Sequence, residues 1–155
     1  MKVLVMMGSA SDKETMQKAA DTLANFGVET DVKILSAHRC ADEVIALAKS
    51  AKSLGYGVII AGAGMAAHLA GVVAGNTTLP VIGVPLYSKW FQGLDALYSV
   101  VQMPKGVPVA TVAVDGSVNA AILAVQILAV YDADLAAKLA DYKETMKNDV
   151  LELNK

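Results

Sequence analysis

Short apolar runs alternate along the chain with longer segments in which apolar residues recur at helical spacing. The apolar runs are rich in β-branched residues and bounded by glycine or proline, and they predict five strands, at residues 2–7, 28–35, 57–64, 79–86 and 107–114. The segments with helical spacing predict helices at residues 12–27, 41–55, 65–74, 92–103 and 118–155. Each predicted strand is therefore followed by a predicted helix.

The first predicted helix shows clear signals at both of its ends. Ser11 and Glu14 fit an S-x-x-E capping box at its start, and Gly27 fits a helix stop. Its apolar positions predict a core-facing side made of Met16, Ala19, Ala20, Leu23 and Phe26.

Five such strand–helix units predict a single α/β domain spanning residues 1–155. Parallel strands need crossover connections, and these are right-handed, so helices cover both faces of the sheet. The predicted fold class is a flavodoxin-like three-layer sandwich with a five-stranded parallel sheet in the order 2-1-3-4-5 and a long helical C-terminal tail. In such sheets a ligand binds beyond the carboxyl ends of the strands where the order reverses, here between the first and third strands.

One long stretch of the chain is uncharged: no Asp, Glu, Lys or Arg occurs between residues 53 and 88. Glycine, Asn-Thr-Thr and proline interrupt it too often for a membrane span, which needs about 20 consecutive apolar residues. The predicted helix at 65–74 is apolar on all sides. We therefore expect one side of that helix to face the sheet and the other to face another subunit.

Composition and charge narrow the classes of partner and compartment. The 155 residues carry 13 basic and 15 acidic side chains, a net charge of -2, and no basic stripe, so nucleic acid is not an expected partner. Cys40 is the only cysteine, which excludes an internal disulfide and suits a reducing cytoplasm. The apolar run at the N-terminus meets Gly8 and Asp12 too soon for a signal peptide, so the expected localisation is cytoplasmic.

The loops after the first and second predicted strands form a candidate anion site. Residues 8–12, "GSASD", offer backbone N–H groups, two hydroxyls and a helix N-terminus to a phosphate, although helix capping alone explains Ser11 and Asp12. Arg39, the only arginine, lies in "SAHRC" at the neighbouring strand end. Its planar guanidinium fits two phosphate oxygens at once, whereas a solvated charge is the alternative for Arg39 taken alone.

The loop after the third predicted strand, "GAGMAAH" at residues 62–68, matches the G-x-G-x-x-A fingerprint of dinucleotide-binding proteins only nominally. It follows the third strand instead of the first, and the acidic residue that should come about 20 positions after the glycines is missing, because the next acidic residue is Asp95. We therefore reject a nicotinamide site. The glycines instead favour a backbone that a flat ligand approaches closely. His68 lies one turn into the predicted helix, where an apolar setting disfavours imidazolium and favours proton transfer near neutral pH. A histidine packed in the core is the alternative.

These residues favour a phosphorylated, planar small molecule handled by one histidine, and they leave the reaction open. Two histidines and one cysteine without metal-ligand spacing predict no metal site, and neither a G-x-S-x-G motif nor a P-loop occurs. A flavin-binding electron carrier with Trp90 and Phe91 stacked on the ring is one alternative. A phosphosugar-binding protein without turnover is another.

Motifs in these loops and beyond resemble the PurE family of purine biosynthesis, the 5-(carboxyamino)imidazole ribonucleotide mutases. The resemblance covers almost the whole chain, in the order "MGSASD", "SAHR", "VIIAGAG" with "AAHL", "LPVIGVP", "GLDALYSVVQMPKGVPVATVAV" and "NAAILAVQIL". It implies conversion of 5-(carboxyamino)imidazole ribonucleotide to 4-carboxy-5-aminoimidazole ribonucleotide, by loss and recapture of carbon dioxide, without a cofactor. It also implies a homo-octamer with each active site at a subunit junction, in which the uncharged stretch and the tail at 118–155 would pack between subunits.

The same resemblance assigns the site residues. Ser9, Ser11 and Arg39 would hold the ribonucleotide phosphate, and Asp12 would bind the ribose hydroxyls. His68 would be the catalytic proton shuttle. The other substrate-binding residues would be Ser36, Ala37, His38, Gly62, Ala63, Gly64, Ala67 and Leu69.

Three positions depart from the pattern of that family. Cys40 and Ala41 stand where Thr-Pro is common, Met65 stands where a third glycine is usual, and Ala70 replaces a proline. Met65 is expected to narrow the mouth of the pocket. Arg39 and His68 resemble the mutases, because the related carboxylases tend to have lysine for the arginine and lack the "AAH" histidine.

Overall fold

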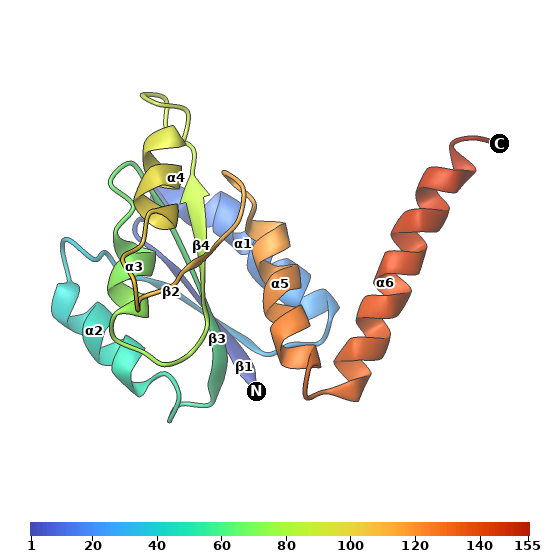
Figure 1. Cartoon of the computed structure of the whole chain (residues 1–155), viewed down its shortest axis with the longest axis horizontal. Coiled ribbons are helices and arrows are strands. Elements are labelled where there is room, and N and C mark those ends of the chain that lie inside the picture. Colours follow the sequence, from blue (N-terminus) through green and yellow to red (C-terminus); the bar gives the residue numbers. More distant parts are fainter.

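Five parallel strands form one sheet in the computed structural model, which describes residues 1–155, and their order is β2-β1-β3-β4-β5 (Figure 1). The predicted order 2-1-3-4-5 is confirmed. The strands are β1 (Lys2–Met7), β2 (Thr30–Ile34), β3 (Tyr56–Gly64), β4 (Val81–Leu86) and β5 (Ala110–Thr111). The helices are a 3-10 turn η1 (Ala10–Asp12), then α1 (Lys13–Asn25), α2 (Ala41–Ser50), α3 (Leu69–Ala74), α4 (Leu94–Val101), α5 (Ser117–Ala129) and α6 (Ala133–Glu152).

Helices cover both faces of the sheet, as the predicted sandwich requires (Figure 1). Alternate residues of β1 enter different cores: Val3 and Val5 pack with α1 and α5, whereas Leu4 and Met6 pack with α2, α3 and α4. Strands buried on both faces are apolar throughout, which is why they are recognisable as continuous apolar runs in the sequence.

The predicted helical tail at 118–155 is two helices with different surroundings. α5 packs against α1 and the sheet and belongs to the core, whereas α6 contacts the body only through its first half, by Leu135, Leu139 and the ring of Tyr142, which packs on Phe26. The chain turns between them, and the Asp132 carboxylate accepts hydrogen bonds from the backbone N–H groups of Asp134 and Leu135, both at 3.1 Å. The rest of α6 extends away from the body (Figure 1).

Three predicted boundaries were wrong for local reasons. The capping box of Ser11 and Glu14 is absent, because η1 precedes α1 and the N-cap of α1 is Asp12, without a side-chain capping bond. α3 begins at Leu69, four residues later than predicted from Met65. β5 is only two residues long and pairs with β4 at Ile82 and Gly83.

None of the helices combines the length and the apolar character that crossing a lipid bilayer requires.

A glycine in β4 allows α4 to pack closely on the sheet, and this generates a prediction about stability. A Cβ atom at Gly83 would lie 2.3 Å from Cγ1 of Val100 and 2.9 Å from Cγ1 of Val109. Gly83→Ala should therefore lower the free energy of unfolding by about 1–3 kcal/mol through overpacking. Urea denaturation followed by circular dichroism measures the change.

Gly75→Ala is the matched control for this substitution. Gly75 has φ of -71°, and a Cβ there would come no closer than 3.5 Å to its nearest neighbour, the carbonyl oxygen of Gly71. The free energy of unfolding of the Gly75→Ala variant should stay within about 0.5 kcal/mol of the wild-type value. Equal stability of the two variants would contradict the packing explanation.

Candidate active site

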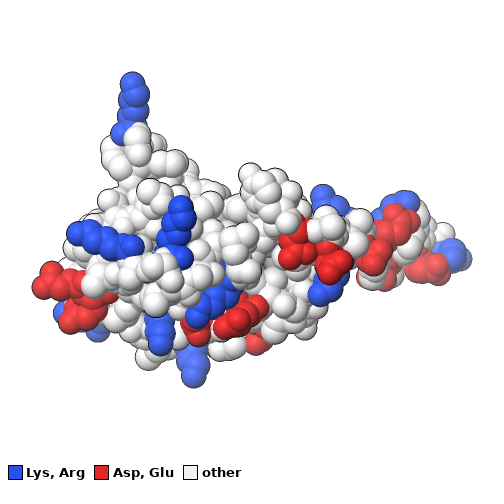
Figure 2. Space-filling view, turned by 90° about the horizontal axis from the view of Figure 1, so that it is seen from below, with Lys and Arg blue, Asp and Glu red and all other residues white.

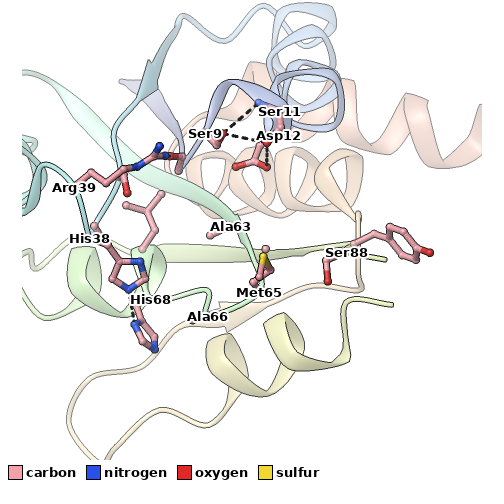
Figure 3. A pocket seen from close by; sticks show the side chains of 16 residues that line it. Ser9, Ser11, Asp12, His38, Arg39, Ala63, Met65, Ala66, His68 and Ser88 are labelled. Carbon is pink, nitrogen blue, oxygen red and sulfur yellow. Dashed lines mark hydrogen bonds between the residues drawn. The ribbon is translucent and has the colours of Figure 1, made fainter. Parts of the chain in front are cut away.

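The loops after β1, β2, β3 and β4 surround one cavity of about 580 Å³ at the carboxyl ends of the strands (Figure 3). Sites for small molecules and cofactors usually fall between about 300 and 1,000 Å³. The cavity is lined by Gly8, Ser9, Ser11, Asp12, Ser36, Ala37, His38, Arg39, Ala63, Gly64, Met65, Ala66, His68, Leu69, Tyr87 and Ser88.

The structure brings the predicted site residues together at this cavity, with two exceptions. Gly62 faces α1, because a Cβ at that position would lie 2.3 Å from the sulfur of Met16. Ala67 is fully buried in the core on the other face of the sheet. Both positions were predicted because they belong to the continuous run from Gly62 to Ala67. Along a strand, however, successive side chains point to opposite faces of the sheet, so neighbouring residues do not all face one cavity.

The first loop places two hydroxyls and a carboxyl group along one wall of the cavity (Figure 3). Ser9 caps η1, and its Oγ accepts a long hydrogen bond, 3.4 Å, from the backbone N–H of Ser11. Oγ of Ser11 lies 3.1 Å from Oγ of Ser9 and 3.3 Å from Oδ1 of Asp12. Because neither serine caps α1, both hydroxyls remain at the cavity beside the positive end of that helix.

The surroundings of Asp12 in the cavity wall shift the pKa of its carboxyl group. Partial burial raises the pKa of its carboxyl group above the ordinary value, and hydrogen bonds from Ser11 and the Ser9 backbone, together with the charge of Arg39, oppose that rise. Burial of the ionised carboxylate therefore costs folding free energy at neutral pH, and this cost disappears as the pH falls below the ordinary pKa of an aspartate. A stability cost at a cavity wall is typical of a binding residue.

Arg39 ties the second loop to the first. Its Nη2 donates a hydrogen bond to the carbonyl oxygen of Gly8 at 2.8 Å, so the guanidinium is held across the gap between β1 and β2. An arginine has five N–H donors, and this contact uses one of them. The exposed guanidinium can therefore bind an anion at the same wall as Ser9 and Ser11.

The two histidines of the chain are hydrogen-bonded to each other, a pairing that sequence analysis missed. Nε2 of His38 lies 2.8 Å from Nδ1 of His68, and the two rings meet edge to face with centroids 4.9 Å apart (Figure 3). One of these nitrogens must carry the proton and the other must offer a lone pair, so the two rings cannot both be imidazolium. The pair can hold one proton and pass it between the two loops.

The predicted surroundings of His68 were wrong. His68 is the N-cap of α3 rather than a residue one turn inside a helix, and it is exposed rather than enclosed by apolar side chains. The side-chain partner that the structure gives His68 is His38, and apolar neighbours do not enclose it.

Two of the unusual residues shape the loops around the cavity. The thiol of Cys40 accepts a hydrogen bond from the Ser36 backbone N–H at 3.1 Å and lies 3.2 Å from the Ser36 carbonyl oxygen, to which it can donate. It thus closes the loop that carries His38 and Arg39. Met65 adopts φ of 55°, a left-handed conformation that favours glycine, and its side chain is 54% exposed beside the cavity.

Tyr87 and Ser88 also line the cavity, and sequence analysis did not assign them to the site. They follow β4, which lies next to β3 in the sheet. The sequence could have indicated both residues, because the predicted strand order places the end of the fourth strand beside the end of the third. No group of three or more histidine, cysteine or acidic side chains is arranged to hold a metal ion.

The chain matches one family profile and several named relatives along almost all of its length. Residues 2–149 match the sequence profile of the family described as AIR carboxylase. The chain is 53% identical over 150 residues to the N5-carboxyaminoimidazole ribonucleotide mutase of Saccharolobus solfataricus, with 97% of this chain and 95% of that protein covered. It is 48% identical over 153 residues to the mutase of Escherichia coli K12, with 97% and 90% covered.

A solved structure extends the comparison to three dimensions. The crystal structure of Treponema denticola PurE superposes with a TM-score of 0.89 at 34% sequence identity, and the match covers 97% of this chain and 94% of that one. The family profile and these relatives each span nearly the full length of the chain. The chain therefore belongs to the AIR carboxylase family, the family of the PurE proteins that its motifs resemble.

Proposed function

We propose that the protein is a mutase of purine biosynthesis, which converts 5-(carboxyamino)imidazole ribonucleotide to 4-carboxy-5-aminoimidazole ribonucleotide. One observation carries the proposal: a single cavity combines a phosphate-binding wall with a hydrogen-bonded pair of histidines. Relatives that are 48–53% identical over nearly the full chain are named as mutases, which supports this reaction over the carboxylation in the family description. The presence of both Arg39 and the "AAH" histidine supports it as well.

The phosphate and ribose of the substrate bind at the first wall. Ser9, Ser11 and Arg39 hold the phosphate, assisted by the N-terminus of α1, and Asp12 binds the ribose hydroxyls. Ser36 and Ala37 line the next part of the cavity. The backbone at Ala63 and Gly64 leaves room for the flat imidazole ring.

The reaction proceeds in two steps within this cavity. The carbamate N–C bond breaks, carbon dioxide is released, and the nitrogen takes a proton to give aminoimidazole ribonucleotide. The ring carbon then attacks the trapped carbon dioxide, a C–C bond forms, and the ring carbon loses its proton. One proton is given in the first step and recovered in the last, so a single histidine pair serves both, and no cofactor is needed.

His68 is the proposed proton shuttle, and the contact with His38 gives it a partner. The pair carries one extra proton before the first step, and the 2.8 Å contact between Nδ1 of His68 and Nε2 of His38 lets that proton reside on either ring. His68 gives it to the carbamate nitrogen in the first step and takes it back from the ring carbon in the last. The two rings therefore work as one unit with one mobile proton.

The proposed assembly is a homo-oligomer, with an octamer as the family resemblance implies. Exposed aromatic and aliphatic side chains gather in the loop before α4 and on that helix, at Trp90, Phe91, Leu94, Tyr98 and Val101. Lys, Asp and Glu side chains follow one another along α6 (Figure 2), so the surface of that helix differs from the exposed apolar residues before and on α4. Large apolar patches of this kind mark interfaces between proteins. A cytoplasmic location is proposed for this enzyme.

Turnover of the substrate tests the proposed function. The protein is incubated with 5-(carboxyamino)imidazole ribonucleotide in the absence of ATP and added metal, and the carbon-carboxylated isomer is followed by chromatography. Formation of the isomer faster than in the protein-free control supports the proposal. Absence of the isomer from a folded preparation would reject it.

Replacing the proposed shuttle should remove catalysis and preserve binding. His68→Asn should lower kcat about a hundred- to ten-thousand-fold, because positioned acid–base catalysis has roughly that value. His38→Asn should fall in the same range, and the double variant should be little worse than either single one, since residues acting as a unit are not additive. Turnover above half of wild type in His68→Asn would show that this residue only packs.

Replacing Arg39 should weaken phosphate binding in proportion to the hydrogen bonds lost. Arg39→Lys should raise KM about tenfold and Arg39→Ala about a hundredfold or more, because lysine keeps the charge without the planar fork. The dephosphorylated nucleoside should bind wild type and both variants equally weakly. Lys33→Ala, which removes an exposed positive charge from neighbouring β2, is the control and should leave KM unchanged. Loss of nucleoside binding in the Arg39 variants would show that Arg39 positions something other than phosphate.

Sedimentation tests the proposed assembly. At micromolar concentration the protein should sediment as a species many times the 16.1 kDa mass of one chain, because the exposed apolar side chains favour burial between subunits. A monomer under these conditions would contradict it.

A further inference from the structure

Ser88 carries the only buried side-chain oxygen or nitrogen that has no hydrogen-bond partner in the protein. A hydroxyl without a partner costs free energy wherever water cannot reach it, so native proteins rarely keep one without a use. Ser88 is half-buried as a residue, and it lines the same cavity as the paired histidines. Its hydroxyl is therefore a polar group at the active site that the protein leaves unsatisfied.

The backbone around Ser88 is held in place from both sides. The backbone N–H of Tyr87 donates to Oδ1 of Asp115 at 3.0 Å, and the N–H of Gln92 donates to the Ser88 carbonyl oxygen at 2.9 Å. The backbone N–H of Asp115 donates to the Pro85 carbonyl oxygen at 2.9 Å, and Asp115 has a left-handed backbone conformation with φ of 56°. With the backbone fixed in this way, a change of χ1 between staggered positions is the movement that would turn the Ser88 hydroxyl from its buried position toward the cavity.

The position of Ser88 in the cavity indicates which part of a ligand it meets. Ser9, Ser11 and Asp12 form one wall, and the histidines lie on another, whereas Ser88 lies beside Met65 on the side away from His38 and His68 (Figure 3). No lysine, arginine or acidic side chain lines that side. The phosphate and the ribose have proposed partners on the other walls, so the charged group of the substrate that remains is the carbamate carboxylate on its 5-amino nitrogen.

We propose that the Ser88 hydroxyl donates a hydrogen bond to the carboxylate of the bound imidazole ribonucleotide, an inference that rests on the proposed function. A neutral donor suits this carboxylate because it must leave as uncharged carbon dioxide. A lysine or arginine there would stabilise the charged ground state more than the transition state for decarboxylation. The hydroxyl orients the carboxylate and, after the N–C bond breaks, returns to its buried position.

The test compares a ligand that has the carboxylate with one that lacks it. Ser88→Ala should raise KM for 5-(carboxyamino)imidazole ribonucleotide about tenfold to a hundredfold, the value of a hydrogen bond to a charged group. Aminoimidazole ribonucleotide, which has no carboxylate, serves as a competitive inhibitor, and its inhibition constant should stay within about twofold of wild type. The urea midpoint of Ser88→Ala should equal or exceed that of wild type, because no partner is lost.

Ser117→Ala is the matched control. Ser117 is fully buried, and its hydroxyl donates to the Thr15 carbonyl oxygen at 2.7 Å, away from the cavity. This variant should lose stability and keep the wild-type KM and inhibition constant.

The possible outcomes separate this inference from the proposed function. A selective rise in KM with unchanged stability supports it. An equal effect on both ligands, no effect on either, or a fall in stability like that of Ser117→Ala would overturn the role of Ser88 and leave the mutase proposal standing. Wild-type protein that neither turns over the carbamate nor binds aminoimidazole ribonucleotide would overturn both.

Discussion

The site depends on the central position of β1, between two parallel neighbours whose carboxyl ends are level with its own. Met7, the last residue of β1, is in register with Ile34 of β2 and with Gly62 of β3. The three following loops therefore leave the sheet at one edge, where the strand order reverses. The contacts among these three loops follow from this register, including the bond from Arg39 to Gly8 and the pairing of His38 with His68, residues 30 positions apart.

Much of the fold was predictable because both faces of the sheet are buried. Continuous apolar runs and helical periodicity reveal the strands and helices, and the handedness of crossovers leaves few possible orders. The tail at 118–155 was predicted as one helix because helical spacing continues through the turn that Asp132 caps. β5 was predicted too long because the segment is β-branched, whereas an edge strand needs few paired residues.

The candidate site was predicted as a set of loops and not as a set of contacts. Periodicity carries no information on χ angles, so the hydrogen bond between the histidines and the unsatisfied hydroxyl of Ser88 could be found only in three dimensions. Two residues that the sequence analysis singled out shape the loops around the cavity. Cys40 closes its loop through the Ser36 backbone, and Met65 adopts a left-handed backbone conformation in which a glycine would be unstrained.

The central proposal is that one cavity releases carbon dioxide and recaptures it, and that the histidine pair gives one proton in the first step and recovers it in the last. A carbamate substrate labelled with carbon-13 in its carboxyl group, converted in the presence of excess unlabelled bicarbonate, tests this claim directly by NMR spectroscopy of the product. The account predicts that the label appears in the carboxylate on the ring carbon. An unlabelled product carboxylate would contradict it, because the protein would then be using carbon dioxide from solution.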